Sequence, residues 1–413
     1  MKTAVVGGGA AGFFLAINLK EMCPQMDVTI FEASHHVLAK VKISGGGRCN
    51  CTNSFEDVAD LQSIYPRGHR LLKRLFKQFS HRDAYRWFES RGVKLVTQDD
   101  HCVFPQSQSS QTIIDLFLRE ARRLGVTIQT GCRITSLDNL SDYDFIAVTT
   151  GGMNHSSFLI SHFSFSDIVA PLPSLFTFTI EDKALRNLMG TVVEASAMIP
   201  GTKMRASGPL LITHWGMSGP CILRLSSYAA RLLSENNYQL PLSVNWTRLK
   251  ENEVQQQLAD FCRQYPQKQL PSMRPFDLPQ RLWNYLIEKG LPGRTHAPWG
   301  SLNQKELNRL TNTLINDTYQ IAGRAPFKDE FVTCGGISLT AVNPSTLESK
   351  EHPRLYFAGE VLDIDGVTGG FNFQAAWTTA YTVAQAISRL TSSMSFPRLS
   401  AMASADIPAL TNI

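Results

Sequence analysis

The residues with the clearest chemistry are three glycines near the N-terminus: Gly7, Gly9 and Gly12. They follow an apolar run typical of a buried strand, and their G-x-G-x-x-G spacing is that of a dinucleotide-binding turn. The first glycine permits a tight turn, the second lets the backbone approach a pyrophosphate, and the third lets a helix pack closely on the strand. That helix would point its positive end and unpaired N–H groups at the phosphates. A glycine-rich turn that binds nothing is the alternative.

An acidic residue follows where a ribose would need it. Residues 28–32 form a second apolar run that ends in Glu32, 20 residues after Gly12. A carboxylate at this place binds ribose hydroxyls in dinucleotide-binding domains. The intervening helix carries an apolar stripe for packing on a sheet, formed by Ala11, Leu15, Leu19 and Met22. The order strand, turn, helix, strand and acid favours a dinucleotide-binding domain over a bare turn.

Two later segments favour FAD over NAD. Residues 144–152 predict a buried strand that ends in a Thr-Gly-Gly turn, similar to the turn of flavoproteins in which a strand returns under the FAD. Residues 355–374 predict a strand, a glycine-rich segment and a helix. The N-terminus of such a helix stabilises the negative charge of a reduced flavin, and the glycines let the backbone approach a flat ring. An ordinary glycine-rich loop before a core helix is the alternative.

The block that begins at Lys40, KVKISGGGRCNCTN, resembles the K-x-x-x-S-G-x-G-R-C-N-x-T-N block of one flavoprotein family. Its members include aminoacetone oxidase-like proteins and BaiN-like dehydro-bile-acid reductases. Further blocks that agree with this family lie at residues 103–105, 207–220, 333–337 and 359–374. The resemblance implies a flavoprotein fold, FAD as cofactor and a redox activity.

The glycines and polar residues from Ser44 to Thr52 predict a backbone nest, in which several N–H groups and one cation, Arg48, can bind an anion. Such a nest would cover the pyrophosphate and flavin side of the cofactor, where Arg48 neutralises phosphate or orients a substrate anion. A solvated loop with an exposed arginine is the alternative. With the resemblance, the expected FAD-binding residues are Gly7, Gly9, Ala10, Ala11, Gly12, Glu32, Ala33, Lys40, Lys42, Ser44, Gly45, Gly46, Arg48, Cys49, Asn50, Thr52, Ile134, Thr150, Gly151, Gly152, Gly359, Glu360, Asp365, Gly370, Asn372, Phe373 and Gln374.

The composition is that of an ordinary globular protein. A chain of 413 residues, 43% hydrophobic and 18% charged, can bury a large core and form two or three domains. The formal charge of +5 does not indicate a nucleic-acid partner by itself. No apolar run approaches the about 20 residues that cross a bilayer, and the first strand occupies the place of a signal peptide. The eight cysteines form no C-x-x-C pair, which predicts a reducing cytoplasm without structural metal or disulfides.

The hydrophobic period changes along the chain. It predicts helices over 69–90 and 113–123, a strand over 126–134, antiparallel strands around 176–180 and 240–246, and helices within 253–315. We therefore predict an α/β fold: a discontinuous, Rossmann-like FAD-binding domain of the two-dinucleotide-domain type, with an inserted β-rich domain and a small helical domain. The predicted boundaries are 1–160 and 326–390 for the FAD-binding domain, 161–250 for the β-rich insert, 251–325 for the helical insert and 391–413 for a loose tail.

Few residues offer chemistry beyond the cofactor. His214 follows an apolar strand, titrates near neutral pH and is the catalytic candidate for moving a proton during hydride transfer. A structural histidine before a helix is the alternative. Cys49 and Cys51 stand where FAD disulfide reductases keep a redox pair, but C-x-C spacing strains a disulfide. Cys49 is therefore expected to pack beside the cofactor rather than to exchange thiols.

These observations predict an FAD-dependent oxidoreductase. No second G-x-G-x-x-G follows a strand, so electrons pass between flavin N5 and a small organic substrate, an amine or an enone-like carbon–carbon bond. NAD(P)H without a domain of its own, or oxygen, is the expected partner. Two alternatives stay open. One is a nucleic-acid-linked flavoprotein of the tRNA-modification type that uses the basic helix at 70–91, for which a solvated face is the favoured interpretation. The other is a non-catalytic FAD redox sensor.

Overall fold

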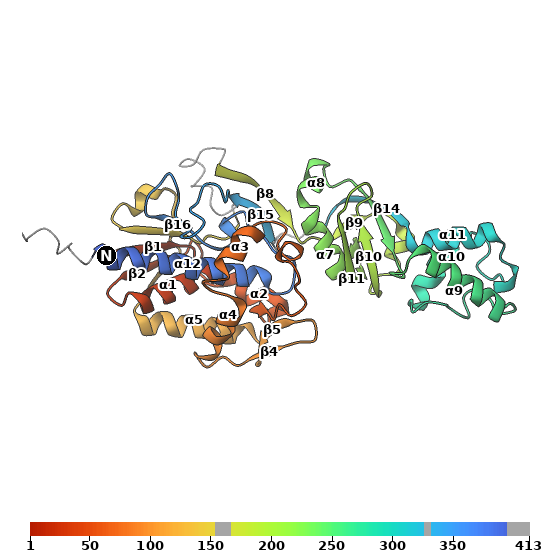
Figure 1. Ribbon diagram of the computed structural model, residues 1–413, viewed down its shortest axis with the longest axis horizontal. Helices are drawn as coiled ribbons and strands as arrows, with labels where there is room; N and C mark the ends of the chain where they lie inside the picture. The colour runs from red at the N-terminus through yellow and green to blue at the C-terminus, as the bar shows by residue number, and fades with distance from the viewer. Residues whose placement is uncertain (153–166, 326–331, 395–413) are drawn as a thin grey trace, which may run out of the picture.

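The computed structural model describes residues 1–152, 167–325 and 332–394. The molecule is elongated (Figure 1). The N- and C-terminal parts of the chain build one domain together at one end, a β-barrel lies in the middle, and a group of helices lies at the other end.

A five-stranded parallel sheet forms the centre of the first domain, in the order β16-β7-β1-β2-β6. Its strands are β1 (Lys2–Val6), β2 (Asp27–Phe31), β6 (Thr127–Gln129), β7 (Phe145–Val148) and β16 (Leu355–Phe357). β16 pairs with β7 in parallel, so the C-terminal part of the chain completes the sheet that the N-terminal part begins. The predicted Rossmann-like α/β fold class is thereby confirmed. The strand predicted over 126–134 is shorter than expected.

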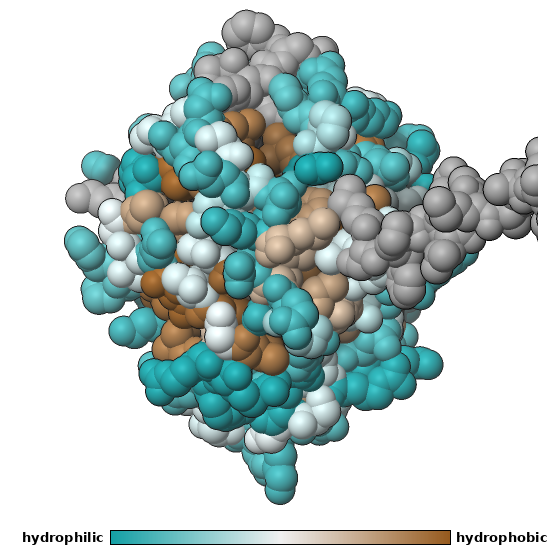
Figure 2. All heavy atoms as spheres, turned by 90° about the vertical axis from the view of Figure 1, so that its left-hand side faces the viewer, coloured by the Kyte–Doolittle hydropathy of each residue, from teal (hydrophilic) through white to brown (hydrophobic). Residues whose placement is uncertain are grey.

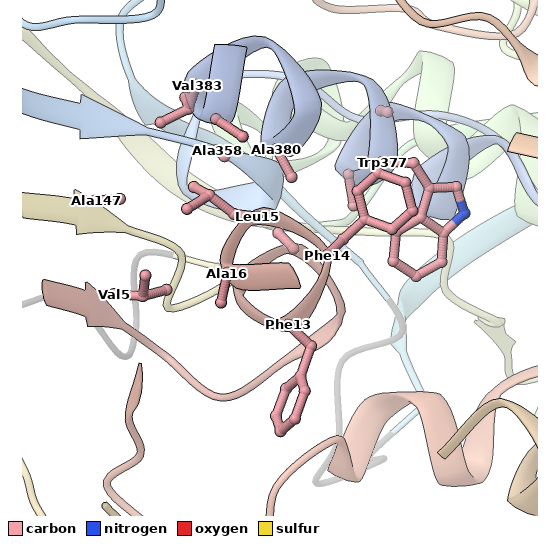
Figure 3. Packing of buried hydrophobic residues seen from close by; sticks show 14 of the residues in the cluster. Val5, Phe13, Phe14, Leu15, Ala16, Ala147, Ala358, Trp377, Ala380 and Val383 are labelled. Carbon is pink, nitrogen blue, oxygen red and sulfur yellow. The ribbon is translucent and has the colours of Figure 1, made fainter. Parts of the chain in front are cut away.

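Helices α1 (Ala10–Met22) and α12 (Phe371–Met394) pack on this sheet and on each other, and α5 (Ser110–Leu124) packs against α1. Figure 3 shows α1 between the strands that carry Val5 and Ala147 and the helix that carries Val383. The aromatic ring of Phe14 lies 5.1 Å from that of Trp377 on α12. Because α1 is apolar on nearly every face, it is buried from all sides and forms the centre of the core.

The helix predicted over 69–90 is two helices, α3 (His69–Leu75) and α4 (His81–Glu89). Ser80 starts α4 with a capping box, in which its hydroxyl and its backbone N–H both contact the Asp83 carboxylate (2.6 and 2.8 Å). A capped serine ends one helix pattern and begins another, so the prediction of a single helix was wrong. The same domain contains α2 (Ala39–Gly47) and a small sheet of β3 (Thr52–Asn53), β5 (Cys102–Pro105) and β4 (Leu95–Thr97).

Strands β8 (Ile168–Ser174) and β15 (Val332–Ile337) pair with each other and connect the first domain to a closed six-stranded barrel. The barrel strands are β9 (Phe178–Ile180), β10 (Val192–Met198), β11 (Arg205–Ile212), β12 (Gly216–Ser218), β13 (Pro241–Asn245) and β14 (Asp317–Arg324). The helices beside the barrel are α6 (Lys183–Arg186), α7 (Gly219–Tyr228) and α8 (Ala230–Glu235). The predicted half-exposed sheet is therefore closed on itself, which leaves no free edge strand.

The outer helices are α9 (Glu251–Gln264), α10 (Gln280–Gly290) and α11 (Gln304–Ile315). The segment 317–324, which we assigned to the helical insert, is strand β14 and pairs with β13 and β9. That assignment was wrong because β14 alternates buried and exposed residues over only eight positions, directly after a helix. The outer helices thus form an insertion between strands β13 and β14 of the barrel.

The tail predicted over 391–413 also needs correction at its start. Helix α12 continues to Met394. In its last turns, hydroxyls donate to carbonyls of the preceding turn, from Thr391 to Ile387 (2.9 Å) and from Ser392 to Ser388 (3.0 Å). The remainder of that tail, 395–413, lies outside the described residues.

The end of the molecule remote from the barrel has a mixed surface. Figure 2 shows hydrophilic side chains around this face, with patches of apolar residues between them. Within residues 1–152, 167–325 and 332–394, no helix is both long enough and apolar enough to cross a bilayer.

Substitution of Trp377 tests how much the packing of the first domain's core contributes to its stability. Its side chain is fully buried, and its indole N–H donates to the Cys51 carbonyl (2.8 Å). We expect Trp377→Ala to lower the free energy of unfolding of this domain by about 3–5 kcal/mol, because it leaves a large cavity. Trp377→Phe keeps most of the packing and should cost only about 1–3 kcal/mol for the unpaired carbonyl. Urea unfolding of the apoprotein checks both values, and an unchanged Trp377→Ala midpoint would contradict them.

Candidate functional site

The three N-terminal glycines form a turn that leaves room for a ligand. Gly7 has a φ of +115°, and its N–H donates to the Phe31 carbonyl (2.8 Å). A Cβ on Gly12 would lie 2.0 Å from the Gly7 carbonyl oxygen, so α1 can only pack against the turn when residue 12 is glycine. A Cβ on Gly9 would meet no atom within 4 Å. The space beside Gly9, at the uncapped N-terminus of α1, is where a pyrophosphate would bind.

Glu32 lies at the end of β2, next to this turn. Its carboxylate accepts hydrogen bonds from the backbone N–H of Gly8 (2.9 Å) and of Ser34 (2.8 Å). These two bonds fix the carboxylate, and each oxygen keeps a lone pair for a further donor. The geometry suits the predicted contact with a ribose. Ala33, the next residue, is exposed.

The block from Lys40 to Asn50 is a short helix that breaks at its glycines. Ser44 leaves the helical region with a ψ of 149°, and Gly45, Gly46 and Gly47 all have positive φ. The regular helical part of α2 thus ends before Ser44, where the predicted nest of donors begins. A Cβ on Gly46 or Gly47 would meet nothing within 4 Å, so this backbone is open to a ligand.

Arg48 is held by its own loop rather than left free. Its guanidinium stacks over the Phe104 ring at 4.2 Å, and its Nε donates to the Gly45 carbonyl (3.1 Å). Nη1 also contacts the Gln108 side chain at 3.4 Å. Arg48 therefore supports the glycine backbone, and its charge remains close to whatever that backbone binds.

The C-terminal segment meets the N-terminal turn directly. The Ala358 N–H donates to the Val148 carbonyl (3.1 Å), and a Cβ on Gly359 would lie 3.0 Å from the Cβ of Ala11. Glu360 follows, and its carboxylate accepts from Lys40 Nζ (2.8 Å) and from the Thr333 N–H (2.8 Å). The two ends of the domain are thus in contact around one place.

The N-terminus of α12 lies against the loop after α2. Thr52 Oγ1 donates to Gln374 Oε1 (2.6 Å), and Asn53 Nδ2 donates to the Gly369 carbonyl (3.0 Å). A Cβ on Gly370 would lie 2.2 Å from the Thr52 carbonyl oxygen. Only glycine permits this approach. The positive end of α12 therefore begins beside the loop that carries Asn50.

Other predicted site residues have partners inside the protein. Asn372 exchanges hydrogen bonds with Gly366 (2.8 Å each way), and Phe373 stacks on Trp377 with ring centroids 5.4 Å apart. Ser44 donates to the Val41 carbonyl (2.8 Å). Asp365 is fully buried, and burial raises its pKa, which the guanidinium of Arg67 opposes. Cofactor contacts from these side chains stay predictions.

The remaining predicted residues lie at the edges of the site. A Cβ on Gly151 would come within 3.7 Å of the Glu360 carboxylate, and one on Gly152 within 2.5 Å of Thr333 Oγ1. Ile134 is partly buried in the core after β6. The other four are Ala10 at the start of α1, its neighbour Ala11, Thr150 after β7 and the exposed Lys42.

Cys49 and Cys51 are both fully buried and not bonded to each other, with their sulfur atoms 3.9 Å apart. Burial raises the pKa of the Cys51 thiol well above its ordinary value, so this thiol stays protonated. A protonated, buried thiol is a poor nucleophile. The geometry agrees with the expected packing role.

His214 lies in the turn between β11 and β12. Its side chain is exposed, and its ring contacts that of Trp215, with centroids 4.8 Å apart. In the part of the chain that the structure describes, His214 has no hydrogen bond or ion pair with the first domain. Its role in proton transfer therefore stays a prediction.

Sequence reasoning missed the contacts that join the barrel to the first domain. Arg67 pairs with the Asp365 carboxylate and donates to the Ser227 carbonyl on α7 (3.0 Å). Asp365 also accepts from Ser174 Oγ on β8 (3.0 Å). Arg231 on α8 pairs with Asp363 (3.0 Å). The spacing D-x-D in the C-terminal segment was visible, but its partners are far away in the sequence.

The described residues fit an FAD. Three glycines of this site, Gly9, Gly46 and Gly47, leave open space where a Cβ would stand. The side-chain oxygen of Asn50 is buried and has no partner among the described atoms. A buried acceptor without a donor is rare in a folded protein, and a ring N–H of a flavin would satisfy it.

Comparisons with known proteins show what this chain is similar to. The family profile described as the HI0933-like protein Rossmann domain matches residues 1–386. A protein named ribosomal RNA dihydrouridine synthase from Haemophilus influenzae is 25% identical, over 93% of this chain and 98% of its own length. The Escherichia coli protein of the same name is 26% identical, over 92% and 96%. The 3-dehydro-bile acid delta(4,6)-reductase of Clostridium scindens is 24% identical, over 93% and 98%.

Gly9→Val provides a clean test of the cofactor site. The backbone of Gly9 has a negative φ of −90°, which valine can adopt, and its Cβ would meet no protein atom. We expect the apoprotein to unfold at the wild-type temperature, while the Kd for FAD rises at least about 100-fold because the side chain occupies the phosphate position.

Gly12→Ala is the matched comparison, since its Cβ would collide with the turn itself. That variant should lose thermal stability whether or not FAD is present. Wild-type FAD affinity in Gly9→Val, measured by flavin fluorescence titration, would contradict the assigned position of the pyrophosphate.

Proposed function

This chain belongs to the HI0933-like family of FAD-dependent oxidoreductases, and we propose that it reduces a carbon–carbon double bond conjugated to a carbonyl group. The proposal selects the enone-like substrate over the amine that the sequence also allowed. The expected substrate is a planar molecule that lies against the flavin ring. Direct docking of NAD(P)H is the proposed source of electrons.

The reactions in the names of the matched proteins support this proposal. A dihydrouridine synthase saturates the double bond of a uracil ring, which is conjugated to a ring carbonyl. A 3-dehydro-bile acid delta(4,6)-reductase acts on double bonds conjugated to a 3-oxo group. The two substrates differ in size and polarity, but the reacting group is of one chemical class. We infer that this chain works on the same class.

The residues around the site support such a reduction. When bound and reduced, FAD supplies a hydride equivalent. The N-terminus of α12 at Gly370 places the positive end of a helix beside the buried Asn50 oxygen, which favours negative charge there. The Lys40–Glu360 ion pair joins α2 to the C-terminal segment across the site. These groups bind and orient, and the conjugated carbonyl of the substrate takes up the electron pair.

Anaerobic spectroscopy tests the proposal. The FAD-loaded protein is reduced with one equivalent of dithionite and mixed with 2-cyclohexen-1-one, and the flavin absorption near 450 nm is followed. We expect the yellow colour to return, with cyclohexanone as the product. Cyclohexanone itself, which has no double bond, is the control and should leave the flavin reduced. A flavin that oxygen reoxidises but that no conjugated carbonyl compound reoxidises would contradict the proposed reaction.

RNA uridine is a second candidate substrate, favoured by a specific surface. Helix α3 begins two residues after Arg67 and exposes Arg70, Lys73 and Arg74, followed by the exposed Lys77. This basic face therefore starts at the junction between the barrel and the FAD-binding domain. Clustered cations of this kind bind phosphates. A uridine of a bound RNA would then present the same conjugated carbonyl group.

Charge reversal on this face tests the RNA candidate. We expect wild-type protein to shift the mobility of total RNA at moderate salt, and Arg70→Glu with Lys73→Glu to weaken the binding and lower its salt slope by about 2, one for each phosphate contact. The control is Lys305→Glu with Arg309→Glu on α11, which changes the net charge by the same amount but outside this basic face. It should leave RNA binding unchanged. No mobility shift of RNA by the wild type would remove this candidate.

A further inference from the structure

Arg224 lies on the face of α7 that meets the FAD-binding domain. The side chains of α7 that point into the barrel are buried, among them Cys221 and Leu225. One turn after Arg224, the Ser227 carbonyl accepts a hydrogen bond from Arg67 (3.0 Å), and Tyr228 donates to the Ser63 carbonyl (2.7 Å). Residues three and four apart share a helix face, so Arg224 faces the same domain one turn before these contacts. Figure 1 shows α7 on the side of the barrel nearest that domain.

The arginines at this junction differ in their partners. Arg67 pairs with Asp365, and Arg231 pairs with Asp363. Arg224 is exposed, and within the described ranges its guanidinium has no acidic residue, carbonyl or aromatic ring as a partner. The two paired arginines hold the barrel in place, and Arg224 is the cation on this face that is available to a ligand.

The α7 face that carries Arg224 meets the C-terminal segment that leads into α12. The Ser227 hydroxyl, three residues after Arg224, lies 3.5 Å from the Asp365 carboxylate of that segment. The segment continues to Gly369, whose carbonyl accepts a hydrogen bond from Asn53 Nδ2 (3.0 Å) at the start of α12. Arg224 thus lies on the side of the barrel that borders the segment between Asp365 and the N-terminus of α12.

We propose that Arg224 is a catalytic residue that binds the conjugated carbonyl oxygen of the substrate. This inference rests on the proposed function. A hydride equivalent from reduced FAD forms a C–H bond at the β carbon, and the π electrons of the double bond move to the carbonyl oxygen as an enolate. The α carbon then takes a proton from water, the carbonyl reforms, and FAD is left oxidised by two electrons. The N–H groups of Arg224 stabilise the enolate oxygen.

An arginine suits this task better than a lysine. The guanidinium stays charged at every working pH and presents N–H groups in one plane, which matches the lone pairs of a planar carbonyl or carboxylate. Charge that develops on an oxygen during a reaction is stabilised most by donors that are already in place. Because α7 is anchored at Ser227 and Tyr228, the backbone that carries Arg224 is fixed before a substrate arrives.

Binding of benzoate tests the site without turnover. Benzoate is a planar oxyanion that FAD cannot reduce, and its binding near a flavin changes the flavin spectrum. We expect FAD-loaded wild-type protein to give a saturable difference spectrum, Arg224→Gln to raise the Kd at least 10-fold, and Arg224→Lys to raise it less. Arg309→Gln on α11 removes the same charge far from the junction and should keep the wild-type Kd. Unchanged FAD content and melting temperature show that each variant is folded.

The rate of flavin reoxidation by 2-cyclohexen-1-one tests the catalytic role. We expect Arg224→Gln to slow it about 100-fold at saturating enone, as loss of one oxyanion donor does in other enzymes. If Arg224→Gln leaves both the benzoate Kd and this rate unchanged, or if the wild type binds no benzoate and reduces no enone, the inference is overturned. If the wild type reduces no enone but Arg224→Gln still loses benzoate, the proposed function fails and Arg224 stands as an oxyanion-binding residue.

Discussion

Close approach of one backbone to another, at positions that lack a Cβ, is the constraint on which the rest of this structure depends. A side chain at Gly12 would place its Cβ 2.0 Å from the Gly7 carbonyl oxygen, and one at Gly370 would place it 2.2 Å from the Thr52 carbonyl oxygen. Because these positions are glycine, α1 packs on the turn and α12 packs on the loop after α2. β16 can then pair with β7, and the two distant parts of the chain enclose one site.

The same closure decides where the barrel lies. The chain leaves the FAD-binding domain after β7 and returns along β15. The barrel and its outer helices are therefore connected to that domain through the paired strands β8 and β15. Asp365 is fully buried at that junction, and an unpaired carboxylate there would cost several kcal/mol. Arg67, Ser174 and Ser227 supply its partners, two of them from the inserted part. Displacement of the barrel would unpair this carboxylate, so the buried charge ties the position of α7 to that of the C-terminal segment.

Sequence patterns predicted what local chemistry dictates. The glycine turn, Glu32 at the end of β2, the strand before Thr150 and the fold class follow from short-range rules of backbone geometry and hydrophobic period. Long-range facts were not predictable in this way. Nothing near Asp365 in the sequence identifies Arg67 as its partner, and nothing near β14 shows that this strand closes a barrel with β13 and β9. The break at Ser80 was missed because apolar residues continue on both sides of it.

A cofactor site built largely from backbone groups also tolerates wide divergence of sequence. Phosphate and flavin contacts made by N–H groups survive replacement of most side chains, provided that the few essential glycines remain. Identities of 24–26% over at least 92% of this chain are compatible with that. In the reaction that we propose, by contrast, the substrate meets a side chain of the inserted part, Arg224. On that proposal, the charges on the face of α7 toward the FAD-binding domain select the substrate, while the glycine backbone holds the cofactor.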